Sequence, residues 1–102
     1  MGKNRIRESL IREIVNIIVH EILVKHMNRA ESVHFLELET IEYKHKAEDI
    51  SERHNWNAED KENIEKKALE LIKEKLAVKY PDARYLEQEV ISKLREIIKD
   101  II

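Results

Sequence analysis

The chain has 102 residues and a net charge of −2, with 42% of its residues hydrophobic and 39% charged. One glycine, one proline and no cysteine are present, so turn-forming residues are too few for an all-β fold, and a disulfide framework or thiolate zinc site is excluded. These features predict one all-α domain, 1–102, with a cytoplasmic location.

The charge distribution and the longest apolar run argue against two kinds of partner. Basic side chains outnumber acidic ones six to three in residues 1–30, whereas the numbers are three and nine in residues 31–60. The sequence therefore shows no basic stripe of the kind that binds nucleic acid. The apolar run at 14–24 is interrupted by His20 and Glu21 and is shorter than the ~20 residues that span a bilayer. We expect neither a nucleic-acid partner nor a membrane partner.

The first two predicted helices cover residues 4–27 and 34–53. The stretch 14–24 is rich in β-branched residues, so a buried strand is its alternative on propensity alone. Length favours a helix. The second helix has apolar or small residues at spacings of three and four, namely Leu36, Thr40, Tyr43, Ala47 and Ile50. Its first part, 33–43, has an extended strand as the alternative.

The third predicted helix, 58–80, carries the clearest local signals. Asn57 is a favourable N-cap, and Asp60 follows three residues later, which is the spacing of a capping box. Apolar residues at helical spacing follow, namely Ile64, Ala68, Leu71, Ile72 and Leu76. The pattern predicts an amphipathic helix with a full polar face.

The fourth predicted helix covers 83–101. Pro81 cannot continue the third helix, so the chain turns there and restarts with Asp82 as an N-cap. The apolar face of this helix contains Leu86, Val90, Leu94, Ile97, Ile98 and Ile101. We expect it to run to the last residues of the chain.

The two halves of the sequence resemble each other. Residues 5–26 align without a gap on residues 59–80 at a constant shift of 54 positions, and a shift of 50 extends the match beyond the next loop. This alignment predicts an internal repeat, 5–54 and 59–102, in which four helices form two tandem helical hairpins related by a pseudo-twofold axis. The alternative is a chance likeness between two amphipathic helices.

Five histidines invite a metal or acid–base interpretation. Their spacing does not favour one, since His20 and His26 are six positions apart and face different sides of a helix. Only His45 and Asp49 form an i, i+4 pair. The full set is His20, His26, His34, His45 and His54. We expect no metal, no cofactor and no catalytic residue.

Arg29 and His34 have the spacing of the Arg and His in the HEPN ribonucleases, which the chain resembles in being small and helical. In that family the two residues act together on RNA at a dimer cleft, so the resemblance implies RNA processing. Here the pair falls in the first predicted interhelical loop, whereas the family carries it late in its bundle.

Two short segments, 46–50 and 82–84, are similar to pieces of archaeal histones, which form helical dimers that wrap DNA. They occur in the reverse order to that family, and no long central helix lies between them. A small helical nucleic-acid-binding or HEPN-like RNA-processing protein is therefore the alternative function.

Three aromatic residues, Phe35, Trp56 and Tyr85, are the candidate partner-binding residues. Trp56 lies in the connection between the two repeats, and Phe35 and Tyr85 are equivalent under the repeat. Their alternative role is to close the ends of the core.

The size, the absence of cysteine and the bias toward Ile, Lys and Glu resemble the small orphan proteins of filamentous viruses that infect hyperthermophilic archaea. The resemblance implies a protein of the host cytoplasm that binds other proteins. The primary functional hypothesis is accordingly a non-catalytic protein-interaction module that uses the groove between its hairpins.

The first helix also predicts self-association. Val19, Asn16 and Ile11 stand where the third helix has Lys73, Glu70 and Glu65, so apolar side chains cover most of its circumference. An apolar helix face that remains exposed on the monomer usually marks a contact surface. In a twofold-symmetric dimer, such a face can be buried against the same face of a second copy. The sequence predicts a homodimer whose interface includes Ile11, Val15, Ile18, Val19 and Ile22.

Overall fold

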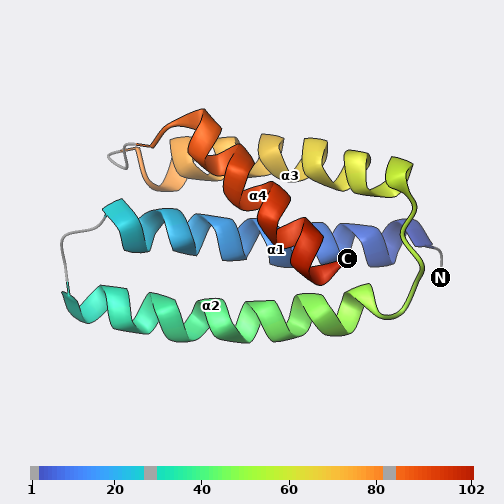
Figure 1. The fold of residues 1–102 in the computed structure, drawn as a ribbon. Coiled ribbons are helices and arrows are strands. Elements are labelled where there is room, and N and C mark those ends of the chain that lie inside the picture. The colour runs from blue at the N-terminus through green and yellow to red at the C-terminus, as the bar shows by residue number, and fades with distance from the viewer. Residues whose placement is uncertain (1–2, 27–29, 82–84) are drawn as a thin grey trace.

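The computed structural model describes the backbone of residues 3–26, 30–81 and 85–102, and the side chains of these residues except 3, 26 and 30–36. Its described residues form four helices and no strand, so the all-α prediction is confirmed (Figure 1). The helices are α1 (Lys3–His26), α2 (Ala30–Ser51), α3 (Ala58–Lys79) and α4 (Glu87–Ile101).

The strand alternatives for 14–24 and 33–43 are wrong, because both stretches are helical throughout. α2 begins four residues earlier than the sequence predicts, and α4 begins four residues later. The predicted N-cap Asp82 lies outside the described residues. Leu86 occupies the N-cap of α4 without a capping hydrogen bond from its side chain.

α1 is the central helix of the fold. It lies between α2 and α3, antiparallel to α2 and parallel to α3, while α4 crosses it obliquely (Figure 1). α1 contacts all three other helices, whereas the described parts of α2 and α3 do not contact each other. The molecule is therefore elongated, with principal extents of 40 × 24 × 22 Å.

The buried hydrophobic residues form one cluster that includes side chains from all four helices. Half of those buried among the described residues belong to α1: Leu10, Ile11, Ile14, Val15, Ile17, Ile18, Val19, Ile22 and Leu23. α3 and α4 supply one buried row each, namely Ile64, Ala68, Ile72 and Leu76, and Val90, Leu94, Ile97 and Ile98. α2 adds the small Ala47, which lets its backbone approach α1 closely.

The expectation that α1 exposes an apolar face is wrong. The five residues predicted for a dimer interface, Ile11, Val15, Ile18, Val19 and Ile22, are only 0–6% exposed within one chain. The physical reason is that α1 is covered from three directions, since α3 and α4 both pack on the side that α2 leaves open. α1 is therefore apolar on most sides because it is the central helix of the bundle. Self-association through these five side chains would require the bundle to open.

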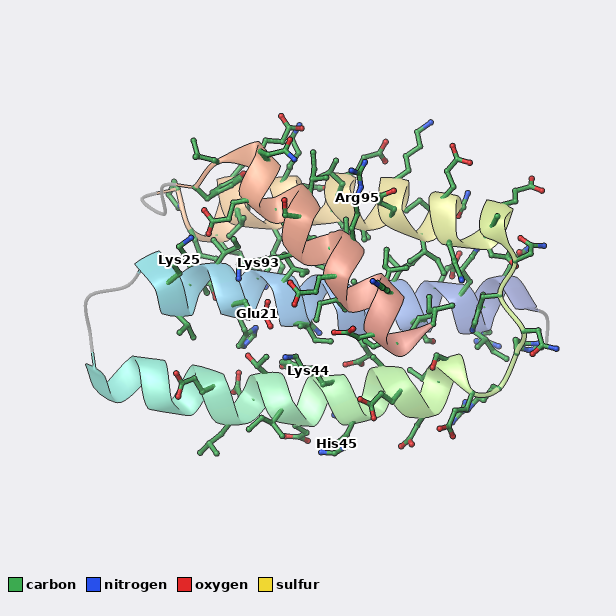
Figure 2. The ribbon with its side chains drawn as sticks, viewed as in Figure 1. Glu21, Lys25, Lys44, His45, Lys93 and Arg95 are labelled. Atoms are coloured by element: carbon green, nitrogen blue, oxygen red, sulfur yellow. The ribbon has the colours of Figure 1, made fainter. Side chains whose placement is uncertain are left out.

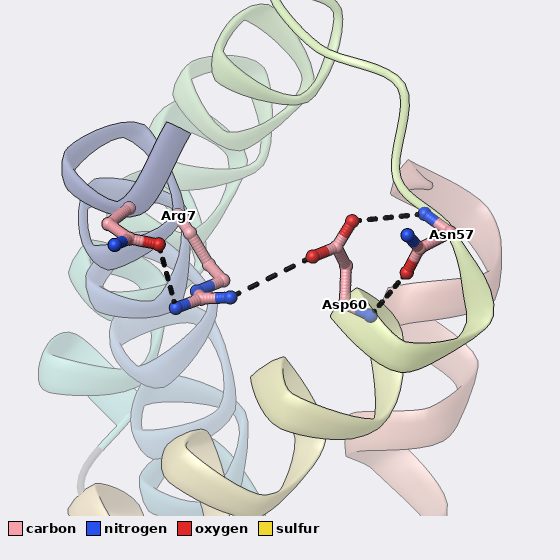
Figure 3. Close-up of polar contacts among 4 residues, drawn as sticks. Arg7, Asn57 and Asp60 are labelled. Carbon is pink, nitrogen blue, oxygen red and sulfur yellow. Dashed lines mark hydrogen bonds and ion pairs between the residues drawn. The ribbon is translucent and has the colours of Figure 1, made fainter. Parts of the chain in front are cut away.

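The start of α3 is fixed by the capping box that the sequence predicts. The backbone N–H of Asp60 donates to Asn57 Oδ1 at 2.8 Å, and the backbone N–H of Asn57 donates to Asp60 Oδ2 at 3.1 Å (Figure 3). The other carboxylate oxygen of Asp60 lies 3.7 Å from Arg7 Nη1. This ion pair ties the beginning of α3 to the beginning of α1.

The repeat of two hairpins stays a prediction. α2 runs alongside α1 for most of its length, whereas α4 is shorter and lies obliquely across α3 and α1 (Figure 1). Within the described ranges, no helix is long and apolar enough to cross a membrane.

A charge at Val19 tests whether α1 is central. Val19 is 1% exposed, so Val19→Glu should lower the free energy of unfolding by more than about 4 kcal/mol, because the carboxylate would be buried without a partner. Val78→Glu is the control, since Val78 is 74% exposed on α3, and should change stability by less than about 0.5 kcal/mol. Urea denaturation followed by circular dichroism measures both. A stable, folded Val19→Glu protein would contradict the central position of α1.

Candidate functional site

A groove of about 640 Å³ lies between α1 and α3. We call it the α1–α3 groove. α1 contributes Glu8, Ile11, Arg12, Val15 and Asn16. α3 contributes Lys67, Leu71, Glu74, Lys75, Val78 and Lys79. Its walls are the first helices of the two predicted hairpins.

The groove has an apolar floor and an exposed apolar rim. Ile11 and Val15 form part of the floor and are 3% and 6% exposed. On α3, Leu71 is 45% exposed and Val78 is 74% exposed. These two side chains are seven residues apart, so they lie on one face of α3, two turns from each other. A ligand seated here would remove both from water.

The charges around the groove are mixed but mainly positive. The lining holds four cations, Arg12, Lys67, Lys75 and Lys79, and two carboxylates, Glu8 and Glu74. The cations on α3 follow its exposed apolar rim. The surface therefore combines apolar contact area with a positive potential.

Lys75 is the most perturbed cation of the groove. Its ammonium group donates to Asn16 Oδ1 at 2.8 Å, which joins the two walls. Burial lowers the pKa of Lys75 below its ordinary value of 10.5, and the like charge of Lys79 lowers it further. Holding a partly desolvated cation in this place costs stability, which is common where a charge serves binding.

On another side of α1, ion pairs fix the neighbouring helices. Glu21 lies between Lys44 of α2 and Lys93 of α4, at 3.3 and 3.8 Å (Figure 2). Lys25 of α1 lies 3.1 Å from Glu89 of α4. We assign these residues to helix packing, because their charged groups face one another.

His20 joins α1 to α2. Its Nε2 lies 2.6 Å from Glu39 Oε2, its Nδ1 lies 2.8 Å from the backbone oxygen of Asn16, and its ring meets Tyr43 edge-on at 5.1 Å. Each ring nitrogen of His20 therefore has an oxygen partner, one on α1 and one on α2. Burial, and then the charges of Glu39 and Glu13, raise the pKa of Tyr43.

The structure does not gather the predicted partner-binding aromatics into one site. Trp56 precedes α3 and Tyr85 follows it, so the 22 residues of that helix separate them, a span of about 33 Å. Trp56 donates its indole N–H to the backbone oxygen of Ser51 at 2.9 Å, and both aromatics pack against the core. The Phe35 side chain lies outside the described residues.

The structure does not bring the predicted histidine, HEPN-like and histone-like residues together in one site. Arg29 and the side chains of His26 and His34 lie outside the described residues, as does the histone-like segment 82–84. His45 is exposed on α2, and His54 contacts the Trp56 ring. In the part of the chain that the structure describes, no three histidine, aspartate or glutamate side chains come together as a metal-binding group.

Sequence reasoning missed the groove, although one signal for it exists. Glu8, Arg12 and Asn16 recur every four residues and form a polar row beside the buried apolar residues of α1. A central helix needs such a row only where its surface meets solvent or a ligand. Leu71, in contrast, has core spacing in α3, and only the three-dimensional arrangement shows that it is exposed.

Comparison with known proteins gives no match. No protein-family model, no curated protein and no solved structure matches this chain. The groove and its charges are therefore the basis for a functional proposal.

The charge of Lys75 gives a prediction for the pH dependence of stability. Its pKa in the folded chain lies below the ordinary value of 10.5, so the unfolded chain binds this proton more tightly than the folded chain does. The charged lysine therefore lowers the free energy of unfolding at neutral pH, and this cost disappears as the pH rises through the folded pKa toward 10.5. Near pH 7, the free energy of unfolding of Lys75→Gln should equal or exceed that of the wild type. This difference between the variant and the wild type should shrink toward about pH 10.

Urea denaturation at a series of pH values measures this difference. The companion variant is Lys79→Gln, which removes the like charge and should raise the pKa of Lys75 measured by NMR. A Lys75→Gln protein that is clearly less stable than the wild type near neutral pH would show that the lysine is a structural contact and not a costly charge.

Proposed function

We propose that the chain is a non-catalytic protein-interaction module whose docking surface is the α1–α3 groove. The observation that carries the proposal is the pair Leu71 and Val78, which are 45% and 74% exposed on one face of α3 beside the buried floor of the groove. Apolar side chains exposed along a concave surface favour a contact site over simple solvation.

The shape of the groove suits a helix as the docked element. Two roughly parallel helices form its walls (Figure 1). Its lining residues extend along both of them, from Glu8 to Asn16 on α1 and from Lys67 to Lys79 on α3. An amphipathic helix binds such a surface by placing apolar side chains at i, i+3, i+4 and i+7 into the depression. The 13 residues from Lys67 to Lys79 correspond to a wall of about 18 Å, or roughly three helical turns.

The composition of the lining supports binding more than catalysis. Among the described residues that line the groove there is no histidine, serine, threonine, cysteine or tyrosine. Lys75, whose pKa is lowered, donates its hydrogen bond to Asn16. His20 is committed to Glu39 on another side of α1.

The same lining favours a protein over a nucleic acid. Glu8 and Glu74 stand among the four cations, and a carboxylate in a phosphate-binding surface opposes the counter-ion release that gives most of the affinity. A protein partner meets such a mixture with side chains of both signs.

Peptide selection followed by calorimetry tests the proposal. Helical peptides selected on the wild-type chain should bind the double variant Leu71→Asp/Val78→Asp at least about tenfold more weakly, because two exposed carboxylates replace the apolar rim. The matched control is Leu86→Asp, which changes a 73% exposed leucine outside the groove and should keep wild-type affinity.

Two results would contradict the proposal. One is a selection that enriches no peptide, or peptides that bind the double variant as tightly as the wild type. The other is tight binding of DNA or RNA at low ionic strength with a steep dependence on salt.

A further inference from the structure

The outer face of α2 carries a second exposed apolar surface. Leu38 and Ile41 are each 54% exposed, and residues at helical spacing continue their face. We call this set the α2 outer stripe; it consists of Leu38, Ile41, Glu42, His45 and Asp49 on α2 and of Glu52, one residue past the end of that helix. All six are exposed, and His45 projects away from the rest of the molecule (Figure 2).

The stripe is acidic. It holds three carboxylates and no lysine or arginine. The nearest cation with a described contact is Lys46, which lies 3.5 Å from Glu42 on the same helix. The stripe is thus the exposed face of a helix that combines two large apolar side chains with a negative potential.

The α1–α3 groove has the complementary properties. Its rim exposes the apolar Leu71 and Val78, and its lining holds four cations against two carboxylates. The lengths are also similar: the stripe extends over the 15 residues from Leu38 to Glu52, about 21 Å, and the α3 wall is about 18 Å long. The α1–α3 groove thus has the shape and charge to hold an amphipathic helix, and the α2 outer stripe is the exposed side of such a helix.

The two surfaces cannot meet within one molecule. α1 lies between α2 and α3, and the described parts of α2 and α3 make no contact (Figure 1). Pairing the stripe with the groove therefore requires two molecules, and it buries different patches on each. Such a heterologous contact builds a ring if the rotation closes and an open filament if it does not.

We propose that the occupant of the α1–α3 groove is the α2 outer stripe of a second copy of this chain. The inference rests on the proposed function, because it names the partner of the same groove. The contact leaves Ile11, Val15, Ile18, Val19 and Ile22 inside each monomer, so assembly does not require the bundle to open.

Complementation between two variants tests the inference with the full chain. The groove variant is Leu71→Asp/Val78→Asp, and the stripe variant is Leu38→Asp/Ile41→Asp. All four positions are 45–74% exposed, so both variants should keep the circular dichroism of the wild type. In sedimentation velocity, the wild type should form species larger than a dimer as its concentration rises, and each variant alone should stay monomeric.

An equimolar mixture of the two variants should form a one-to-one complex, because the groove variant keeps an intact stripe and the stripe variant keeps an intact groove. Added salt should weaken this complex. The control Leu86→Asp places one carboxylate at an exposed leucine outside both surfaces and should assemble like the wild type.

The outcomes separate this inference from the proposed function. A wild type that remains monomeric up to millimolar concentration, variants that still assemble alone, or a mixture that forms no complex would overturn self-docking. If the groove nevertheless binds selected peptides and loses them in the groove variant, the proposed function stands with another protein as partner. If the groove binds neither a selected peptide nor a second copy of the chain, both proposals fail.

Discussion

The whole structure depends on removing the apolar circumference of α1 from water. Nine of its described side chains are buried, and each contributes roughly 1.5 to 3 kcal/mol when it is removed from water. That exceeds the about 1 kcal/mol of a typical net hydrogen bond, so polar contacts adjust the arrangement and do not create it. A helix that is apolar on nearly every side must be surrounded, and α2, α3 and α4 are placed by this requirement.

Three helices around a fourth do not enclose it completely. α2 and α4 are held to α1 by the ion pairs of Glu21 with Lys44 and Lys93, while α3 joins α1 along a different direction. Between α1 and α3 a groove remains, and the polar row of α1 faces it. The candidate site is thus a consequence of how the core is closed, and the exposed Leu71 and Val78 are the part that packing does not explain.

The helices and the capping box at Asn57 follow from local sequence, because N-cap chemistry, Pro81 and apolar spacing act over a few residues. The interface predicted for Val19 was wrong for a physical reason. Sequence shows that α1 needs cover on several sides, but not whether the cover comes from α4 of the same chain or from another chain. The exposure of Leu71 could not be predicted for a similar reason, since its spacing fits a core position and the sequence does not show which sides of α3 other helices cover.

Native-state hydrogen exchange measures the central claim most directly. If α1 is the helix that the others enclose, the amides of residues 14–22 should exchange more slowly than those of α2, α3 and α4, and only through global unfolding. Their exchange free energies should equal the free energy of unfolding measured by denaturant. Exchange of these amides through local opening, at rates as fast as those of the outer helices, would contradict the account.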